Sequence, residues 1–306
     1  MGHIRAPSYP FYSCTFTLHL TFTLNFIMKN EKSFSCEFFP PKTEKGVENL
    51  HKTLSELATL NPAYFSVTFG AGGSTQEGTF DTVKEIQEKD YAAAPHLSCI
   101  GSTQASIREL LNSYIDIGVN RIVALRGDMP SGMREAGEFR YANELVEFIR
   151  SETGNHFHIE VAAYPEFHPQ ASNAQVDMEN FARKVKAGAN AAITQYFYNA
   201  DGYYRFVDDC EKLGVDIPII PGIMPITHYG NLKRFSDMCG AEIPRWIAKR
   251  LDDYGDDIAS ITAFGEEVVT EMCQQLLDNG APGFHFYTMN RADPTRKLWH
   301  NLGIVA

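Results

Sequence analysis

The sequence predicts an α/β fold of eight strands, each followed by a helix. Four helical stretches end at a glycine, and a short apolar run follows each one directly: Gly118, Gly188, Gly214 and Gly280. Glycine just past a helix end supplies the left-handed residue that stops the helix, so each of these positions indicates a helix leading into a strand. Four further apolar runs precede or separate these units, which brings the number of expected strands to eight.

The expected elements follow one another without an interdomain linker. The strands are expected at 34–39, 64–69, 92–99, 122–125, 158–164, 191–195, 217–220 and 283–287. The helices are expected at 46–60, 75–89, 105–118, 141–153, 177–188, 202–213, 232–254 with breaks, and 295–302. Pro40-Pro41 closes the first strand, and Arg126-Gly127-Asp128 with Pro130 closes the fourth. Eight βα units in about 270 residues predict a single-domain (β/α)8 TIM barrel, with a doubly wound open sheet as the alternative.

Composition narrows the class of partner. The chain has 306 residues and a formal net charge of −11, and it contains no basic block, so nucleic acid is not an expected partner. Its 6 cysteines are scattered with no Cys-x-x-Cys, which favours reduced thiols in a cytoplasmic protein. No stretch has the length and apolar content of a membrane span.

The first 27 residues differ from the rest. Between Phe11 and Phe26, Phe, Leu and Thr alternate, with no basic segment before them and no small-residue cleavage site after them. A natural start is visible at Met28, just before the first strand. We therefore expect 1–27 to be a disordered or non-native extension, and 28–306 to be the barrel.

Polar residues gather where the expected strands end. In a barrel all these ends meet at one mouth, where active sites lie. The residues are Glu37, Thr68, His96, Asp128, Tyr164, His168, Gln195, Tyr287 and Arg291. Singly, each has a plainer interpretation: Glu37 as a solvated rim residue, His96 as a hydrogen-bonded structural histidine, or Asp128 as part of a solvated turn.

Several chemistries are excluded by missing motifs. There is no Gly-x-Ser-x-Gly elbow, no P-loop and no Gly-x-Gly-x-x-Gly, and no expected strand contains a lysine. His156 and His158 are spaced for metal but lie at a strand start, so no metal site is expected. A carboxylic acid, an amide and several aromatics remain, which suit a planar heterocycle with Glu37 as proton donor.

At this point the residues resemble a known family. Seven motifs occur in unbroken order between Phe34 and Gly303: 35-SCEFFPPK-42, 66-SVTFGA-71, 122-IVALRGD-128, 162-AAYPE-166 with His168-Pro169, 193-ITQ-195, 219-IIPGI-223 and 284-FHFYTMNR-291. Together they are similar to the methylenetetrahydrofolate reductases. The resemblance implies a barrel that binds FAD and takes electrons from NADH or NADPH. It further implies a cytoplasmic homo-oligomer with small-molecule substrates, acting in one-carbon metabolism and methionine synthesis.

The resemblance also implies roles by matching position. Glu37 corresponds to the general acid, Asp128 lies near both flavin and folate, and Phe235 stacks on the nicotinamide. Gln195, Asn231, Tyr287 and Arg291 match other substrate-side positions. The flavin-side positions are Thr68, Phe69, Ala71, His96, Arg126, Gly127, Asp128, Tyr141, Ala142, Tyr164, His168, Asp177, Asn180, Arg183 and Lys184.

Three departures from the family pattern stand out. Phe69 replaces a common tyrosine, the loop Gly72-Gly73-Ser74 is one residue short, and Asn231 replaces a glutamine.

The implied reaction is ping-pong. A nicotinamide cofactor reduces FAD and leaves, and methylenetetrahydrofolate then takes its place and is reduced to 5-methyltetrahydrofolate. Glu37 assists the opening of the folate ring, and its burial among aromatic neighbours favours the neutral, proton-donating form. The alternatives are another FAD-dependent barrel reductase and a non-catalytic flavin or folate binder.

Overall fold

A computed structural model describes residues 32–69, 75–127 and 137–304 of the protein, without the side chains of residues 75–77. Within these residues the strands are β1 (Ser33–Phe38), β2 (Tyr64–Val67), β3 (Ala93–Ser98), β4 (Arg121–Leu125), β5 (His158–Ala163), β6 (Ala191–Thr194), β7 (Ile219–Ile220), β8 (Gly222–Ile223) and β9 (Gly283–Tyr287). Four sequence predictions lie outside the described part: Ala71, Asp128, the short loop 72–74 and the extension 1–27.

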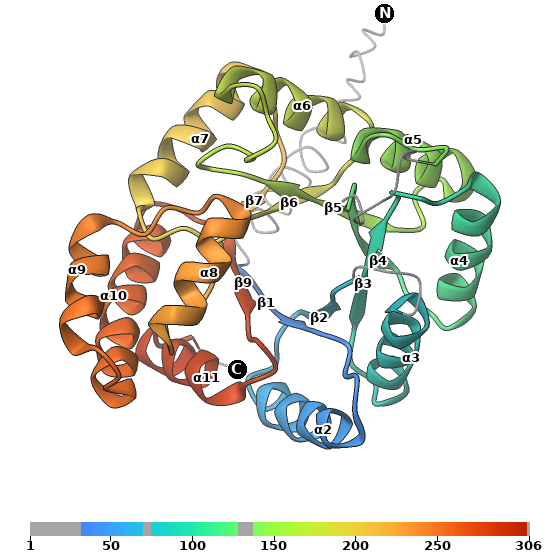
Figure 1. The fold of residues 1–306 in the computed structure, drawn as a ribbon. Coiled ribbons are helices and arrows are strands. Elements are labelled where there is room, and N and C mark those ends of the chain that lie inside the picture. The colour runs from blue at the N-terminus through green and yellow to red at the C-terminus, as the bar shows by residue number, and fades with distance from the viewer. Residues whose placement is uncertain (1–31, 70–74, 128–136, 305–306) are drawn as a thin grey trace, which may run out of the picture. The chain divides into compact units, whose positions relative to one another are not determined.

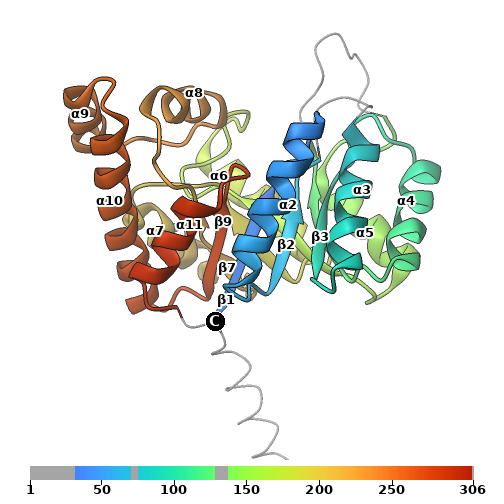
Figure 2. The same cartoon turned by 90° about the horizontal axis from the view of Figure 1, so that it is seen from below.

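The strands form one parallel sheet in the order β7-β6-β5-β4-β3-β2-β1-β9-β8. Seen along its axis, this sheet curls into a barrel with the helices outside (Figure 1), and the side view shows the helices running alongside the strands (Figure 2). The barrel prediction is confirmed, and the open sheet is ruled out.

The seventh strand position is divided. Pro221 separates β7, which pairs with β6, from β8, which pairs with β9. Proline has no amide hydrogen for a sheet ladder, but its carbonyl accepts a hydrogen bond from the His285 amide at 2.9 Å. Gly222 follows, and a Cβ there would lie 2.1 Å from the Thr194 carbonyl oxygen. The single expected strand 217–220 is therefore wrong in its detail: the segment 219–223 closes the barrel in two short pieces.

The described helices cover the outside of the sheet. They are α2 (Glu44–Ala58), α3 (Thr75–Glu88), α4 (Gln104–Asp116), α5 (Ala142–Thr153), α6 (Ala174–Lys186), α7 (Ala200–Lys212), α8 (Tyr229–Cys239), α9 (Arg245–Tyr254), α10 (Ile258–Asp278) and α11 (Ala292–Asn301). The four predicted glycines all have positive φ, between 69° and 118°. The expected helix 232–254 is two helices, because Gly240 ends α8 in a left-handed conformation and Pro244 precedes α9. The 21-residue helix α10 is the one that ends before Gly280.

The fold has two interiors, one between the strands and the helices and one inside the barrel. Between the strands and the helices lies a large apolar core built from side chains such as Phe38, Phe65 and Phe286. Inside the barrel only a small apolar layer forms, from Tyr64, Ala94, Val123 and Ile193. The remaining inward positions of several strands are polar, so the barrel axis carries hydrogen-bonding groups from one end to the other.

We expect the barrel to fold without the first 27 residues. The compact unit of the described structure starts at Ser33, where the β1 ladder begins with the Ser33–Gly283 pair. A chain started at Met28 should keep its melting temperature, measured by circular dichroism, within a few degrees. A large drop would show that the deleted residues stabilise the barrel.

Candidate functional site

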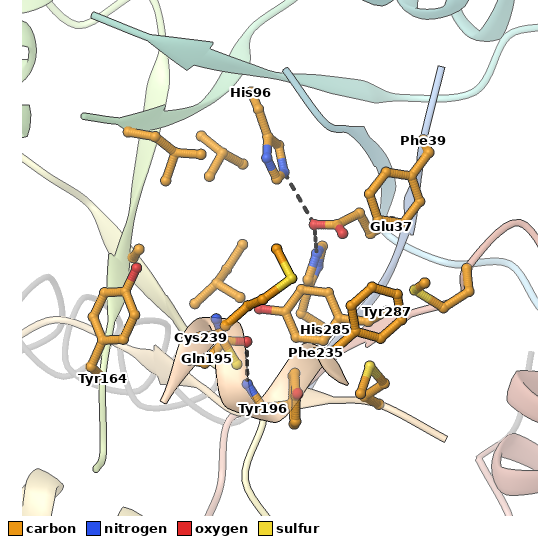
Figure 3. A pocket seen from close by; sticks show the side chains of 17 residues that line it. Glu37, Phe39, His96, Tyr164, Gln195, Tyr196, Phe235, Cys239, His285 and Tyr287 are labelled. Atoms are coloured by element: carbon orange, nitrogen blue, oxygen red, sulfur yellow. Dashed lines mark hydrogen bonds and ion pairs between the residues drawn. The ribbon is translucent and has the colours of Figure 1, made fainter. Parts of the chain in front are cut away.

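A cavity of about 320 Å³ opens at the carboxyl ends of the strands. Figure 3 shows side chains from several strands and from α8 pointing into it. Six predicted site residues line this cavity: Glu37, His96, Tyr164, Gln195, Phe235 and Tyr287. An apolar wall of Val123, Leu125, Ala162 and Ile193 lines another part of it. This mixture suits a flat ring system with a few polar edges.

Glu37 is the only carboxylate among the residues that line the cavity in the described structure. It lies on β1, where its Cα partners are Ser66 on β2 and Tyr287 on β9, and it is only 5% exposed. The residue that follows β9 holds the Glu37 backbone in place, because the Thr288 hydroxyl donates a hydrogen bond to the Glu37 carbonyl at 2.5 Å. Glu37 therefore projects from a fixed strand rather than from a loop.

A left-handed turn after β9 reinforces this position. Met289 and Asn290 both have φ of 53°. Asparagine tolerates this conformation better than most residues. The Asn290 side chain accepts from the Phe39 amide and donates to the Phe39 carbonyl, both at 2.8 Å. The turn thereby pins the end of β1 to the end of β9.

Two imidazoles flank the Glu37 carboxyl group, as Figure 3 shows. The Nε2 atoms of His96 and His285 lie 3.4 and 3.6 Å from Glu37 Oε2. Burial lowers the pKa of His96 to about 4 against a smaller opposing effect of Glu37, so this ring is neutral at pH 7. His96 Nε2 is buried and, among the described residues, makes no well-aligned hydrogen bond, its nearest polar neighbour being Glu37 Oε2. An orphaned polar atom facing a cavity is a position where a ligand atom would bind.

The other side of the cavity is held by hydroxyl and amide contacts. The Tyr287 hydroxyl donates to the Thr194 carbonyl at 2.8 Å, which joins the ends of β6 and β9. The Gln195 side-chain oxygen accepts from the Tyr196 amide at 3.0 Å, so its amide nitrogen is the group left to contact a ligand. Met224, Met238, Met289 and Cys239 add polarisable, adaptable surface.

Most predicted flavin-side residues lie beyond the cavity, at the ends of β4 and β5 and along α6. The His168 amide donates to Asp177 Oδ2 at 2.8 Å, and the Tyr164 and His168 rings meet edge to face at 4.6 Å. Arg183 contacts Asn180 at 2.6 Å, and Lys184 donates to the Ala162 carbonyl. Burial lowers the pKa of Lys184 to about 8, with Asp177 opposing the shift. Asp177, Asn180 and Lys184 are spaced three and four residues apart on α6, so they lie on one side of this helix.

The other predicted flavin-side residues on this side of the barrel lie in the loop after β4 and at the start of α5. The Arg126 guanidinium contacts Gln170, and Gly127 has φ of 82°. A Cβ at Gly127 would lie 1.9 Å from the Ser98 hydroxyl, so the close approach there is to β3. Tyr141 caps α5, next to Ala142, and is exposed.

Four further predicted residues, on other elements, also lie outside the cavity lining. Thr68 and Phe69 follow β2, where the Thr68 amide donates to the Phe38 carbonyl at 2.9 Å. Asn231 is exposed in the first turn of α8, and Arg291 donates to the Thr227 hydroxyl at 3.2 Å. The structure thus places Phe235, but not Asn231, at the cavity wall.

His285 is the main residue that sequence reasoning missed. It lies two positions before Tyr287 on the same strand, and side chains two apart in a strand share a face. The 284-FHFY-287 alternation of buried aromatic and polar residues carried that signal. Phe39, Cys239 and the methionines were missed because adaptable apolar residues have no motif.

The sequence of the chain is similar to that of a known enzyme family. The methylenetetrahydrofolate reductase family matches residues 23–303 of the chain. The chain belongs to this family. The 5,10-methylenetetrahydrofolate reductase of Escherichia coli is 39% identical over 278 residues, covering 90% of this chain and 93% of the relative. The Buchnera aphidicola enzyme from Acyrthosiphon pisum is 41% identical, covering 90% of this chain and 94% of the relative.

A plant member of the family is longer. The Arabidopsis thaliana methylenetetrahydrofolate reductase (NADH) 1 is 36% identical, and the match covers 90% of this chain but 49% of the plant protein. A solved structure with the same fold is an uncharacterised Clostridium thermocellum protein described as binding two copies of 5-methyl-5,6,7,8-tetrahydrofolic acid. Its TM-score is 0.64 at 15% identity, and the match covers 92% of this chain and 96% of that one. Family membership and fold therefore agree with the sequence prediction.

The described residues contain neither a membrane-spanning helix nor a metal-binding cluster. No helix there combines the length and apolar character needed to cross a membrane. No group of three or more His, Cys, Asp or Glu side chains there is arranged to hold a metal ion.

The buried His96 predicts a pH dependence of stability. Its pKa is about 4 in the folded protein and 6.5 ordinarily, so between these values the unfolded chain binds more protons. Stability should therefore fall as pH decreases from 6.5 to 4, by at most about 1.4 kcal/mol per pH unit from this group. Urea unfolding of His96→Asn should show a shallower fall, whereas the exposed His300→Asn should follow the unmodified protein. Parallel curves for all three would contradict the assignment.

Proposed function

We propose that this protein reduces 5,10-methylenetetrahydrofolate to 5-methyltetrahydrofolate with electrons from NADH or NADPH. The observation that carries the proposal is a buried carboxyl group, Glu37, at the mouth of a barrel whose sequence is that of this family. Opening the folate imidazolidine ring requires a proton on the departing nitrogen. A carboxyl group 5% exposed between two imidazoles is suited to deliver it.

FAD is the cofactor that these residues fit. The apolar wall of Val123, Leu125 and Ile193 suits one face of a flat ring, and the orphaned His96 Nε2 offers a hydrogen bond to its polar edge. Arg126, Arg183 and Lys184 provide positive charge for a pyrophosphate along β4 and α6. When bound there, FAD would supply hydride transfer between the nicotinamide and the folate. The predicted contacts of Ala71 and Asp128 remain part of this proposal and lie outside the described residues.

The chain's own residues have three tasks in this scheme. Glu37 holds a proton and gives it to the folate nitrogen. The Gln195 amide nitrogen and the aromatic rings of Phe235 and Tyr287 orient a flat substrate against the wall. The same cavity serves both substrates in turn, which predicts ping-pong kinetics. We also propose that the product supplies methyl groups for methionine synthesis.

The test is spectroscopic. The purified protein should show a flavin absorption spectrum that NADH or NADPH bleaches under anaerobic conditions, and methylenetetrahydrofolate should restore the colour. Bleaching without recovery by methylenetetrahydrofolate would favour another flavin reductase. A flavin spectrum that neither nicotinamide cofactor bleaches would favour a non-catalytic binder.

A further inference from the structure

One residue of the motif 162-AAYPE-166 has no task in the proposed function. Glu166 lies in the loop between β5 and α6 and does not line the large cavity. Its carboxylate reaches the loop between α8 and α9, where Oε2 accepts a hydrogen bond from the Glu242 amide at 2.7 Å. The two residues are 76 positions apart in the sequence, so this contact joins two loops that come from different parts of the chain.

A tight turn after β5 presents Glu166 to this second loop. The Phe167 amide donates to the Tyr164 carbonyl at 3.1 Å, and Glu166 lies between these two residues. Phe167 has φ of 57°, a left-handed conformation that is uncommon for a bulky residue and that persists where surrounding contacts hold it. Burial raises the pKa of the Glu166 carboxyl group, and the hydrogen bond from the Glu242 amide opposes this shift. Glu166 is therefore a partly desolvated carboxylate with a defined partner rather than a solvated loop residue.

The same two loops meet at a second point. Gly240 ends α8 with φ of 76°, and a Cβ there would lie 3.3 Å from the Pro169 ring. The Gly240 backbone and the proline ring therefore pack directly on each other. A small second cavity lies between the loops, and four residues line both it and the large cavity: Tyr164, Gln195, Tyr196 and Cys239. The junction of the two loops is thus continuous with the wall of the large cavity.

Little of α8 is buried. Of its 11 residues two are buried, Leu232 and Ser236, and the Ser236 hydroxyl lies 3.0 Å from the hydroxyl of Tyr196, which follows β6. Met238 is 72% exposed although it lines the large cavity. Segments with little buried apolar surface open locally at a low cost in free energy. The position of α8 therefore depends on contacts at its ends, and the hydrogen bond to Glu166 lies just beyond its carboxyl end.

We propose that Glu166 is a positioning residue that holds α8 against the large cavity and so sets the wall against which the nicotinamide and the folate bind. The proposal rests on the proposed function, in which both substrates use this cavity in turn. α8 supplies Phe235, Met238 and Cys239 to the cavity lining. Glu166 acts through the helix rather than on a substrate, because its hydrogen bond fixes the chain shortly after these three side chains. Binding to a wall that is already in position costs less ordering free energy than binding to a mobile one.

Glu166→Ala tests this role by removing the hydrogen-bond acceptor. With the two half-reactions measured separately by stopped flow, the concentrations of nicotinamide cofactor and of methylenetetrahydrofolate that give half the limiting rate should each rise about fivefold, the order that one lost hydrogen bond produces. The limiting rates should stay within about twofold, because Glu37 and the flavin-side residues are unchanged. Glu166→Gln should recover most of the affinity, since its side-chain oxygen can accept from the same amide. Unchanged half-saturation in Glu166→Ala, or an equal rise in both variants, would overturn the proposal.

Asp257→Ala is the matched control. Asp257 is another carboxylate that accepts from a backbone amide, that of Ser260 at 3.1 Å, and it does not line the large cavity. This variant loses a comparable hydrogen bond at the start of α10, so it reports the effect of lost stability alone. Its half-saturation concentrations should match those of the unmodified protein within about twofold. An equal rise in Asp257→Ala and Glu166→Ala would mean that both reflect a general loosening of the fold, and would overturn the proposal.

A second measurement does not depend on turnover. Hydrogen–deuterium exchange of the backbone around Glu242, followed by mass spectrometry of the purified protein, should be about tenfold faster in Glu166→Ala and within about twofold of the unmodified rate in Glu166→Gln and Asp257→Ala. Glu166→Ser, whose side chain is also too short to reach Glu242, replaces Glu166→Ala if that variant fails to fold. Unchanged exchange in the folded variant would overturn the positioning role. Absence of methylenetetrahydrofolate turnover in the unmodified protein would overturn the proposed function instead, and the exchange comparison would still decide the role of Glu166.

Discussion

Glu37→Gln should slow the folate half-reaction by about 10²–10⁴-fold, which is the usual contribution of general acid catalysis. Glutamine keeps the shape of the side chain and removes its acidic proton. The reduction of the flavin by NADH or NADPH takes no proton from the protein, so its rate should stay within about tenfold. Because the Thr288 hydroxyl contacts the Glu37 backbone rather than its side chain, the position of β1 should not change.

Stopped-flow absorbance measures the two half-reactions separately in the same preparation, so each acts as the control for the other. An equal loss in both would mean that Glu37 positions the flavin and that the proton comes from another group. A loss confined to the nicotinamide half-reaction would also contradict the assigned role.

Arg121→Met should destabilise the fold by about 3–5 kcal/mol, the usual cost of leaving a buried charge without its partner. Glu160 is 0% exposed and its Oε1 lies 2.7 Å from Arg121 Nη1, while the Arg121 guanidinium also stacks over the Tyr64 ring at 4.5 Å. Methionine keeps most of the apolar volume and leaves the buried Glu160 carboxylate with the Tyr64 hydroxyl but without its charged partner. Urea unfolding followed by circular dichroism measures the change in the free energy of unfolding.

Arg108→Met is the matched control. Arg108 pairs with Glu152 through two hydrogen bonds of 2.6 and 2.9 Å, but this pair lies at the surface. Surface pairs contribute little because water solvates the separated charges, so the midpoint should hardly move. Adding Glu160→Gln to Arg121→Met should restore much of the lost stability, since the unpaired charge is then gone. Similar losses for the two arginine variants would show that Arg121 acts through packing alone.

The barrel was predictable because its signals are local. A glycine that ends a helix and an apolar run that begins a strand can be identified within a few residues, as at Gly118 and Ile122. The split at Pro221 was harder, because two residues on each side of the proline are too few to show a pattern. Helix α10 was recognised only by its end at Gly280, since Gly240, Pro244 and Gly255 make the preceding segment irregular.

The candidate site was predictable in part for a similar reason. Residues such as Glu37, Gln195 and Tyr287 lie at the carboxyl ends of strands, and predicting the strands is enough to place them at the mouth of the barrel. The contact between Tyr64 and Glu160 inside the barrel was not predictable. Tyr64 and Glu160 are 96 positions apart in sequence, and their contact depends on the register of strands β2 to β5 and on the curvature that brings their side chains together. The alternation of side-chain direction along 158-HIEVAA-163 indicates that Glu160 faces away from the helices, but it does not predict which residue Glu160 contacts.

The division of the seventh strand makes the sheet weakest at one seam. β7 pairs with β6 through two residue pairs and β8 with β9 through two, whereas β1 and β9 share five. Local opening in proteins begins where few backbone hydrogen bonds must break. Met224, which lines the cavity, comes directly after β8, and α8 with Phe235 follows a few residues later. We therefore expect local opening of the sheet to begin at this seam, where it would loosen the cavity wall that carries Phe235 and leave the β1–β9 pairing that carries Glu37 intact.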